Sequence, residues 1–200
     1  MDIQPSLENM QLAGFSMGAE PLVALDLVDT VMLAEDPPVD LFSSAERADV
    51  WWALEATRLP AGPTPDLVAT RRLRAAIRDL FDAHLEHREP AATSIGDVNA
   101  AVAAAPTSVR LIEGAAGPAR FETRWHTEHG GHAALAEIAR EAIDLLTSPE
   151  RLARLRRCAN PTCSMLFLAE NKRRQWCTAN LCGNRARVAR HYERTHSTTA

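Results

Sequence analysis

Residues 158–185 read CANPTCSMLFLAENKRRQWCTANLCGNR and hold all four cysteines of the chain. The cysteines form two matched pairs with the spacing C-x4-C-x13-C-x4-C. Zinc prefers four thiolates in a tetrahedron, and two close pairs on tight turns deliver them with little backbone strain. Four buried free cysteines or a redox pair are the alternatives, but neither pair has the C-x-x-C spacing that suits thiol exchange. We therefore predict one zinc ion, held by Cys158, Cys163, Cys177 and Cys182.

This ion is expected to be structural, because four sulfur ligands leave no coordination position for water. Around it, residues 164–168 and 174–176 read as two strands of a hairpin with a turn at 170–172. Cys182 then stands at the start of a helix that runs from Gly183 to about Thr195. A knuckle, a hairpin and a helix that supplies the last ligand form a treble-clef-like zinc module.

Charge is divided unevenly along the chain. Residues 151–200 carry eleven Arg/Lys and two acidic residues, a net charge of +9, whereas residues 1–150 carry 11 basic and 24 acidic residues, a net charge of −13. Zinc with four thiolates contributes −2 and leaves the module at about +7. A basic module on an acidic body indicates that the module meets a polyanion and the body does not.

The last helix sorts its side chains by face. At 100° per residue Arg187, Arg190 and Arg194 fall within about 60° of one another, and Val188 and Tyr192 fall opposite, where they can pack on the hairpin and Trp176. The alternative is a solvated charged face. We predict a nucleic-acid-binding surface made of this stripe and the basic hairpin turn, with Lys172, Arg173, Arg174, Arg187, Arg190 and Arg194.

The rest of the chain is mainly α-helical. Apolar periodicity, capping residues and prolines predict helices near 20–34, 43–56, 65–87, 94–105, 132–146 and 148–157. Alternation around Val109–Leu111 and Phe121–Trp125 predicts one β-hairpin. We expect a flexible arm over 1–19, a helical regulatory domain over 20–148 and a zinc-binding domain over 149–200.

The motif residues resemble a known pair of domains. Cys158–Cys163, Leu166-Phe167, Arg174–Cys177 and Cys182-Gly183-Asn184-Arg185 resemble the CGNR zinc finger. The N-terminal part is similar to the ABATE domain of stress-induced transcription regulators, through Leu25–Thr30 and Asn99. Ala169 replaces an acidic residue usual in the family, and Asp29 replaces an asparagine. The resemblance implies a zinc-dependent DNA-binding transcription regulator whose helical domain senses a signal or dimerises.

Further roles follow for individual residues. Neither Asn184 nor Arg185 can ligate zinc beside four thiolates, so we expect Asn184 to brace the zinc turn and Arg185 to tie the helix start to carbonyls or a carboxylate. The resemblance also suggests a ligand pocket for an unidentified small molecule. Its candidate lining is Asp26, Asp29, Thr30 and Asn99. The alternative for the first three is the solvated face of an amphipathic helix.

Other readings remain open. His126, His129 and His132 form either a second metal site or an exposed loop. No catalytic motif is evident, so we do not expect an enzyme. No apolar run is long enough to span a membrane and no secretory signal is evident, so a cytoplasmic protein is expected.

The expected partners are duplex DNA and, as a candidate, a second copy of the chain. The alternative function is a zinc-stabilised protein-interaction adaptor without nucleic-acid binding.

Overall fold

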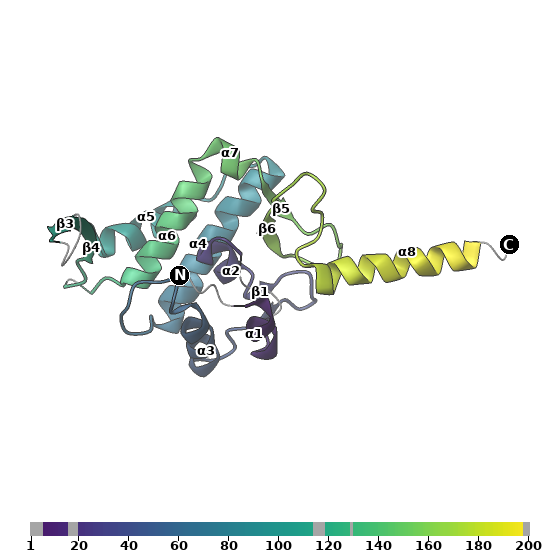
Figure 1. Cartoon of the computed structure of the whole chain (residues 1–200), viewed down its shortest axis with the longest axis horizontal. Helices are drawn as coiled ribbons and strands as arrows, with labels where there is room; N and C mark the ends of the chain where they lie inside the picture. Colours follow the sequence, from purple (N-terminus) through teal and green to yellow (C-terminus); the bar gives the residue numbers. More distant parts are fainter. Residues whose placement is uncertain (1–5, 16–19, 114–118, 129, 198–200) are drawn as a thin grey trace.

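The computed structural model describes residues 6–15, 20–113, 119–128 and 130–197, and it is built around helix α4 (Leu67–Glu86). Asp66 caps this helix by accepting hydrogen bonds from the backbone N–H groups of Val68 and Ala69 at 2.8 and 3.1 Å. The helix ends at Glu86, and the next residue, His87, has a left-handed φ of 54°. Its buried face packs against α2 (Val23–Val28), α5 (Ala92–Ala104) and α6 (Ala133–Leu146), with α4 running diagonally through the body (Figure 1). The prediction of a mainly α fold is confirmed.

The helix predicted over 20–34 is much shorter than expected. α2 ends at Val28, and β1 (Val31–Met32) follows and pairs with β2 (Val39–Asp40). All six residues of α2 are buried, so it has no solvent face. The Thr30 hydroxyl donates to the Leu27 carbonyl at 2.7 Å, which satisfies an acceptor at the end of this helix.

An aromatic cluster fixes the N-terminal segment. α3 (Ala45–Glu55) is capped by Ser44, one residue after the predicted Ser43, and its Trp51 lies 5.5 Å from Phe42 between ring centroids. α1 (Leu7–Leu12) lies within the segment expected to be a flexible arm. Its Met10 and the following Phe15 are buried in the main core, so the described residues 6–15 are packed structure.

The predicted hairpin is confirmed as β3 (Thr107–Ile112) and β4 (Arg120–Trp125), with Val109 opposite Thr123 and Leu111 opposite Phe121. It lies at one end of the molecule, at the left of Figure 1. The predicted helix over 132–146 is confirmed as α6. Within the part of the chain that the structure describes, no helix is long and apolar enough to cross a membrane.

The zinc module pairs its strands differently from the prediction. α7 (Pro149–Leu152) ends well before Arg157, and β5 (Leu155–Arg157) pairs with β6 (Leu166–Leu168). Residues 174–176, expected as the partner strand, are not a strand. A short π-helical turn, η1 (Ala179–Gly183), leads into α8 (Asn184–Ser197). Leu155, Leu166 and Leu168 join the main hydrophobic core, whereas Met165, Phe167 and the cysteines form a second, smaller cluster. The module is thus anchored in the core of the body and also has a small core of its own.

Candidate metal centre and nucleic-acid interface

The four cysteine sulfurs lie together as the sequence predicted. Their Sγ atoms are all within 4.8 Å of one another, and Cys163 Sγ lies 3.9 Å from Cys177 Sγ. A regular zinc tetrahedron with Zn–S bonds of about 2.3 Å places its sulfurs about 3.8 Å apart. The donor set and its spacing therefore fit one structural zinc ion.

The first pair of ligands lies on the turn that follows β5. The backbone N–H of Cys158 donates to the Met165 carbonyl at 2.9 Å, which extends the β5–β6 ladder by one pair. The Asn160 side chain then accepts the Thr162 N–H at 3.2 Å, and Cys163 N–H donates to the Asn160 carbonyl at 2.9 Å. This asparagine-proline turn reverses the chain between the two ligands.

The second pair flanks the start of η1. The Thr178 hydroxyl accepts the Leu181 N–H at 3.3 Å and so holds the turn that carries Cys182. Gly183 donates to the Thr178 carbonyl at 3.0 Å, and a Cβ at this glycine would lie 3.2 Å from the same oxygen. The close approach favours glycine directly after the last ligand.

N–H groups donate hydrogen bonds to two of the sulfurs, those of Cys182 and Cys158. The Asn160 side-chain amide donates to Cys182 Sγ at 3.4 Å, and the Cys177 N–H donates to Cys158 Sγ at 3.5 Å. Donors of this kind orient thiolate ligands and disperse their charge. Asn184, predicted to brace the turn, donates to the Asn180 carbonyl at 2.9 Å. Sequence reasoning missed Asn160 because Asn-Pro indicates only a turn.

The thiols perturb one another strongly. Hydrogen bonding from Cys163 and Cys177 lowers the pKa of Cys158 to about 2, whereas the hydrogen bond to Cys158 raises the pKa of Cys163 to about 12. One thiolate thus disfavours ionisation of the next. A divalent cation removes this conflict, because it stabilises all four sulfurs as thiolates.

Two body carboxylates accept the backbone of the zinc module. The Asp29 oxygens each lie 3.0 Å from the Leu166 N–H, and a Glu20 oxygen accepts the Leu168 N–H at 3.3 Å. These N–H groups lie on the edge of β6 that faces away from β5. Burial raises the pKa of Asp29 well above its ordinary range, and Arg78 and the Leu166 N–H oppose that shift.

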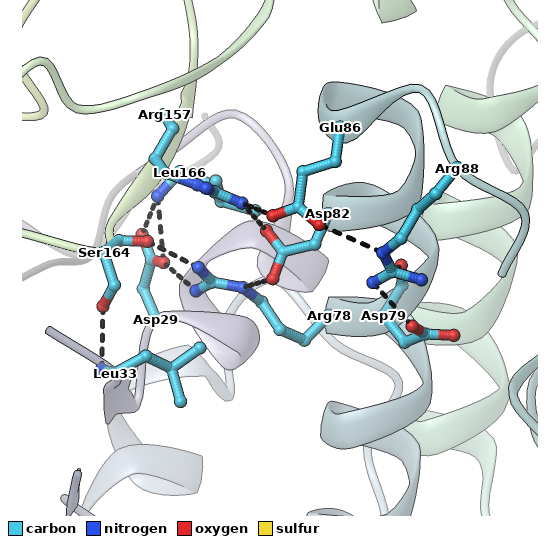
Figure 2. A network of polar contacts seen from close by, with 10 residues as sticks. All are labelled: Asp29, Leu33, Arg78, Asp79, Asp82, Glu86, Arg88, Arg157, Ser164 and Leu166. Atoms are coloured by element: carbon cyan, nitrogen blue, oxygen red, sulfur yellow. Dashed lines mark hydrogen bonds and ion pairs between the residues drawn. The ribbon is translucent and has the colours of Figure 1, made fainter. Parts of the chain in front are cut away.

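Arg78 completes this contact from α4 (Figure 2). Its guanidinium donates to the Ser164 carbonyl at 2.8 Å, pairs with Asp82 at 2.7 Å and lies 3.7 Å from Asp29. Arg157 of β5 donates to Asp82 and Glu86 at 2.7 Å each. The network joins α2, α4, β5 and the chain that leaves Cys163.

The predicted ligand pocket is not assembled. Asp26 is buried and pairs with Arg58 at 2.6 Å, Asp29 holds the zinc module, and Thr30 accepts a hydrogen bond from Arg74 at 3.0 Å. Asn99 is exposed on α5. The three buried groups are committed to internal contacts, so their role here is structural.

Arg174 differs from the other predicted nucleic-acid contacts. It pairs with Glu20 at 2.6 Å, donates to the Cys177 and Leu168 carbonyls at 2.6 and 3.1 Å, and lies 4.4 Å over the Phe167 ring. Its guanidinium is thus bound by groups of the module and by Glu20 of the body. Lys172 and Arg173, its neighbours, are exposed.

Helix α8 projects away from the body and forms the far end of the molecule (Figure 1). Val188 and Tyr192 are 68% and 63% exposed, so the prediction that they pack on Trp176 is wrong. Arg185 is exposed, and no carboxylate or carbonyl among the described residues binds it, contrary to the expected structural tie. Arg187 is exposed and donates to Asn184, and Arg194 is exposed; the Arg190 side chain lies outside the described residues.

The described histidines of the 126–132 segment form no metal cluster. His126 Nε2 lies 2.8 Å from the Ser108 hydroxyl, and His132 precedes α6 as its N-cap, while His129 lies outside the described residues. Among the residues that the structure describes, the four cysteines are the only group of cysteine, histidine and acidic side chains placed to hold a metal.

The fold and the site define a helical protein with a C-terminal tetracysteine zinc module. Residues 22–149 match the family model ABATE, described as "Putative stress-induced transcription regulator", and residues 154–195 match the CGNR zinc finger. The chain belongs to the ABATE family and carries a CGNR zinc finger at its C-terminal end. Comparison with curated proteins gives no match. The architecture predicted from the motifs is confirmed.

Proposed function

We propose that this protein is a zinc-dependent, DNA-binding transcription regulator and not an enzyme, acting in the cytoplasm. The observation that carries the proposal is helix α8, which projects from the body with Arg185, Arg187 and Arg194 exposed. An α-helix fits the major groove, and arginine binds phosphate and guanine edges. Both matched families, a transcription regulator and a zinc finger, support this function.

The zinc module gives the helix its position. Cys182 lies in η1, directly before α8, and the other three ligands connect η1 to β5 and β6. β6 in turn is held by Asp29 and Glu20 of the body. Zinc therefore fixes the direction in which α8 leaves the body, which makes DNA binding dependent on the metal.

Duplex binding across a salt series tests the proposal. Phosphate contacts release counterions, so log affinity should fall with log salt at about −0.9 per contact. Five contacts would give a slope of roughly −4 to −5. They would come from Lys172, Arg173, Arg187, Arg190 and Arg194. Fluorescence anisotropy with random duplex oligonucleotides measures it, before and after zinc removal. Absence of binding at low salt would reject the proposal.

The exposed apolar stripe of α8 favours a second candidate. One open groove is lined by Val188, Tyr192 and Arg185 of α8 and by Leu181 of η1. A basic helix with such a stripe also suits an acidic protein surface, which is the adaptor function. The same titration separates the two, because an adaptor would not bind random duplex DNA with this salt dependence.

A further inference from the structure

The β3–β4 hairpin has an apolar face that nothing in the described chain covers. Val109, Leu111 and Phe121 are 72%, 75% and 73% exposed. Val109 is opposite Thr123 and Leu111 is opposite Phe121, so all four side chains lie on the same face. The other face carries the polar pairs Ser108–Arg124 and Arg110–Glu122.

The apolar face packs on the body at the Thr107–Trp125 end of the hairpin and is exposed to solvent beyond it. Arg140 of α6 donates to the Thr107 hydroxyl at 3.0 Å and lies 4.8 Å over the Trp125 ring. Thr107 and Trp125 are opposite each other and precede the Val109–Thr123 pair on the same face. The face therefore starts against the body and continues outward without a partner.

A two-stranded hairpin with an exposed apolar face is expected to pack against another surface. Two isolated strands are at best marginally stable in water, and an apolar face usually packs on another layer. Large apolar patches rimmed by polar residues mark interaction sites. The hairpin stands at the end of the molecule opposite α8 (Figure 1), so this surface is separate from the proposed DNA-binding helix.

The charge of the hairpin indicates which partner fits. Residues 1–150 carry a net charge of −13, so two bodies repel each other over most of their surface. Residues 107–125 are an exception: they carry Arg110, Arg120 and Arg124 against Glu113 and Glu122, a net charge of +1. A second copy can therefore approach here with little repulsion, and the alternating signs allow its own hairpin to pair across a two-fold axis.

From these observations we infer that the apolar face of the β3–β4 hairpin is a self-association surface, and that its partner is the same face of a second copy of this chain. Leu111 and Phe121 of each copy form the centre of the contact. The contact is confined to one face of a two-stranded hairpin in each copy, so the dimer is weak and depends on concentration. Dimerisation leaves α8 of both copies free.

Light scattering across a dilution series, without DNA, tests the inference. The wild-type mass should rise from 21.9 kDa towards twice that value as concentration increases. Phe121→Asp should keep the protein monomeric at every concentration. The double variant Leu111→Thr with Phe121→Thr should do the same, and it keeps β-forming residues in both strands. Circular dichroism and thermal unfolding verify that both variants are folded.

Val68→Asp is the matched control, because Val68 is 75% exposed on α4 and is not part of the hairpin. It should dimerise as the wild type does. A wild type that stays monomeric over the whole series would overturn the inference. So would a dimer that survives the hairpin substitutions, or one that Val68→Asp dissociates equally. None of these measurements depends on DNA binding, so the inference and the proposed function fail independently.

Discussion

The carboxylate of Asp29 accepts the backbone N–H of Leu166, with each oxygen 3.0 Å from the nitrogen. Asp29 caps α2 of the body, and Leu166 opens β6 of the zinc module. A side chain thus takes the place that a neighbouring strand would have at this edge of β6. Together with Arg78 it makes the module part of the body and not an appended unit.

Replacing Asp29 with Ala should destabilise the whole protein. The change leaves the Leu166 N–H without its acceptor and removes a carboxylate that faces the buried Arg78 guanidinium. Removing one member of a buried ionic contact costs about 3–5 kcal/mol. Urea unfolding followed by tryptophan fluorescence measures the free energy of unfolding. Asp97→Ala breaks the exposed pair with Arg72 and should cost less than about 1 kcal/mol; equal losses would contradict the role of Asp29.

Zinc removal should destabilise the body as well as the module. Leu155, Leu166 and Leu168 pack in the main core, so a module that loses its metal also loses part of that core. Elemental analysis should find one zinc per chain. Calorimetry should show one transition that moves to lower temperature with a chelator or with Cys158→Ser, and an unshifted body transition would contradict the contribution of these three leucines to the main core.

The sequence predicted the metal ligands but not the strand that holds them. Cysteine pairs are informative because four thiolates in two close pairs satisfy zinc, independently of the surrounding fold. β6 was assigned to the wrong partner because Leu166, Phe167 and Leu168 are all buried and show no alternation that would mark one covered face. β5 is only three residues long, and the helical start at Pro149 masked it.

The contacts predicted for two arginines differ from those in the structure. Arg174 stands beside Lys172 and Arg173, and a basic run is normally solvated, but Glu20, distant in sequence, binds Arg174. Arg185 was expected to bind carbonyls or a carboxylate, but it lies exposed beside the apolar residues of α8. Local periodicity contains neither the contact that binds Arg174 nor the direction in which α8 leaves the body.

Arg174→Ala and Arg173→Ala should therefore behave differently. Loss of Arg174 leaves the buried Glu20 carboxylate unpaired and removes donors to two carbonyls, which should cost about 3 kcal/mol of stability. Arg173 is exposed, so its replacement should change stability by less than about 0.5 kcal/mol while weakening DNA binding. Thermal unfolding and anisotropy on both variants distinguish the roles. The reverse pattern would place Arg174 at the DNA surface.

Glu141 should make stability fall as pH rises. Its carboxylate accepts the Ala24 N–H at 2.9 Å, and burial raises its pKa from 4.5 to about 7. The folded protein therefore holds a proton here that the unfolded chain releases above its lower pKa, so this stabilisation is complete below 4.5 and is lost as pH rises through 7. The full effect is at most about 3 kcal/mol.

Glu141→Gln removes this dependence while keeping an oxygen that can accept the Ala24 N–H. Urea unfolding at about pH 5 and about pH 8 should show the variant close to the wild type at the lower value and more stable at the higher one. Comparing the two proteins at each pH cancels the effect of pH on zinc binding. A variant that is less stable than the wild type at the higher pH would show that the ionised carboxylate stabilises the fold.

The α8 arginines give the strongest test of the DNA-binding surface. Arg187→Ala, Arg190→Ala and Arg194→Ala combined should weaken binding to every duplex sequence and reduce the salt slope by about 0.9 for each phosphate that the variant no longer neutralises. Alanine has the highest helix propensity, so circular dichroism should show α8 intact and the free energy of unfolding should be nearly unchanged.

A matched control is Arg110→Ala with Arg124→Ala on the exposed hairpin, which lies far from α8 in Figure 1 and should leave the salt slope unaltered. A loss confined to one base position would make that arginine a reader of bases in the groove. An unchanged affinity of the triple variant, with the helix intact, would move the nucleic-acid contact away from α8.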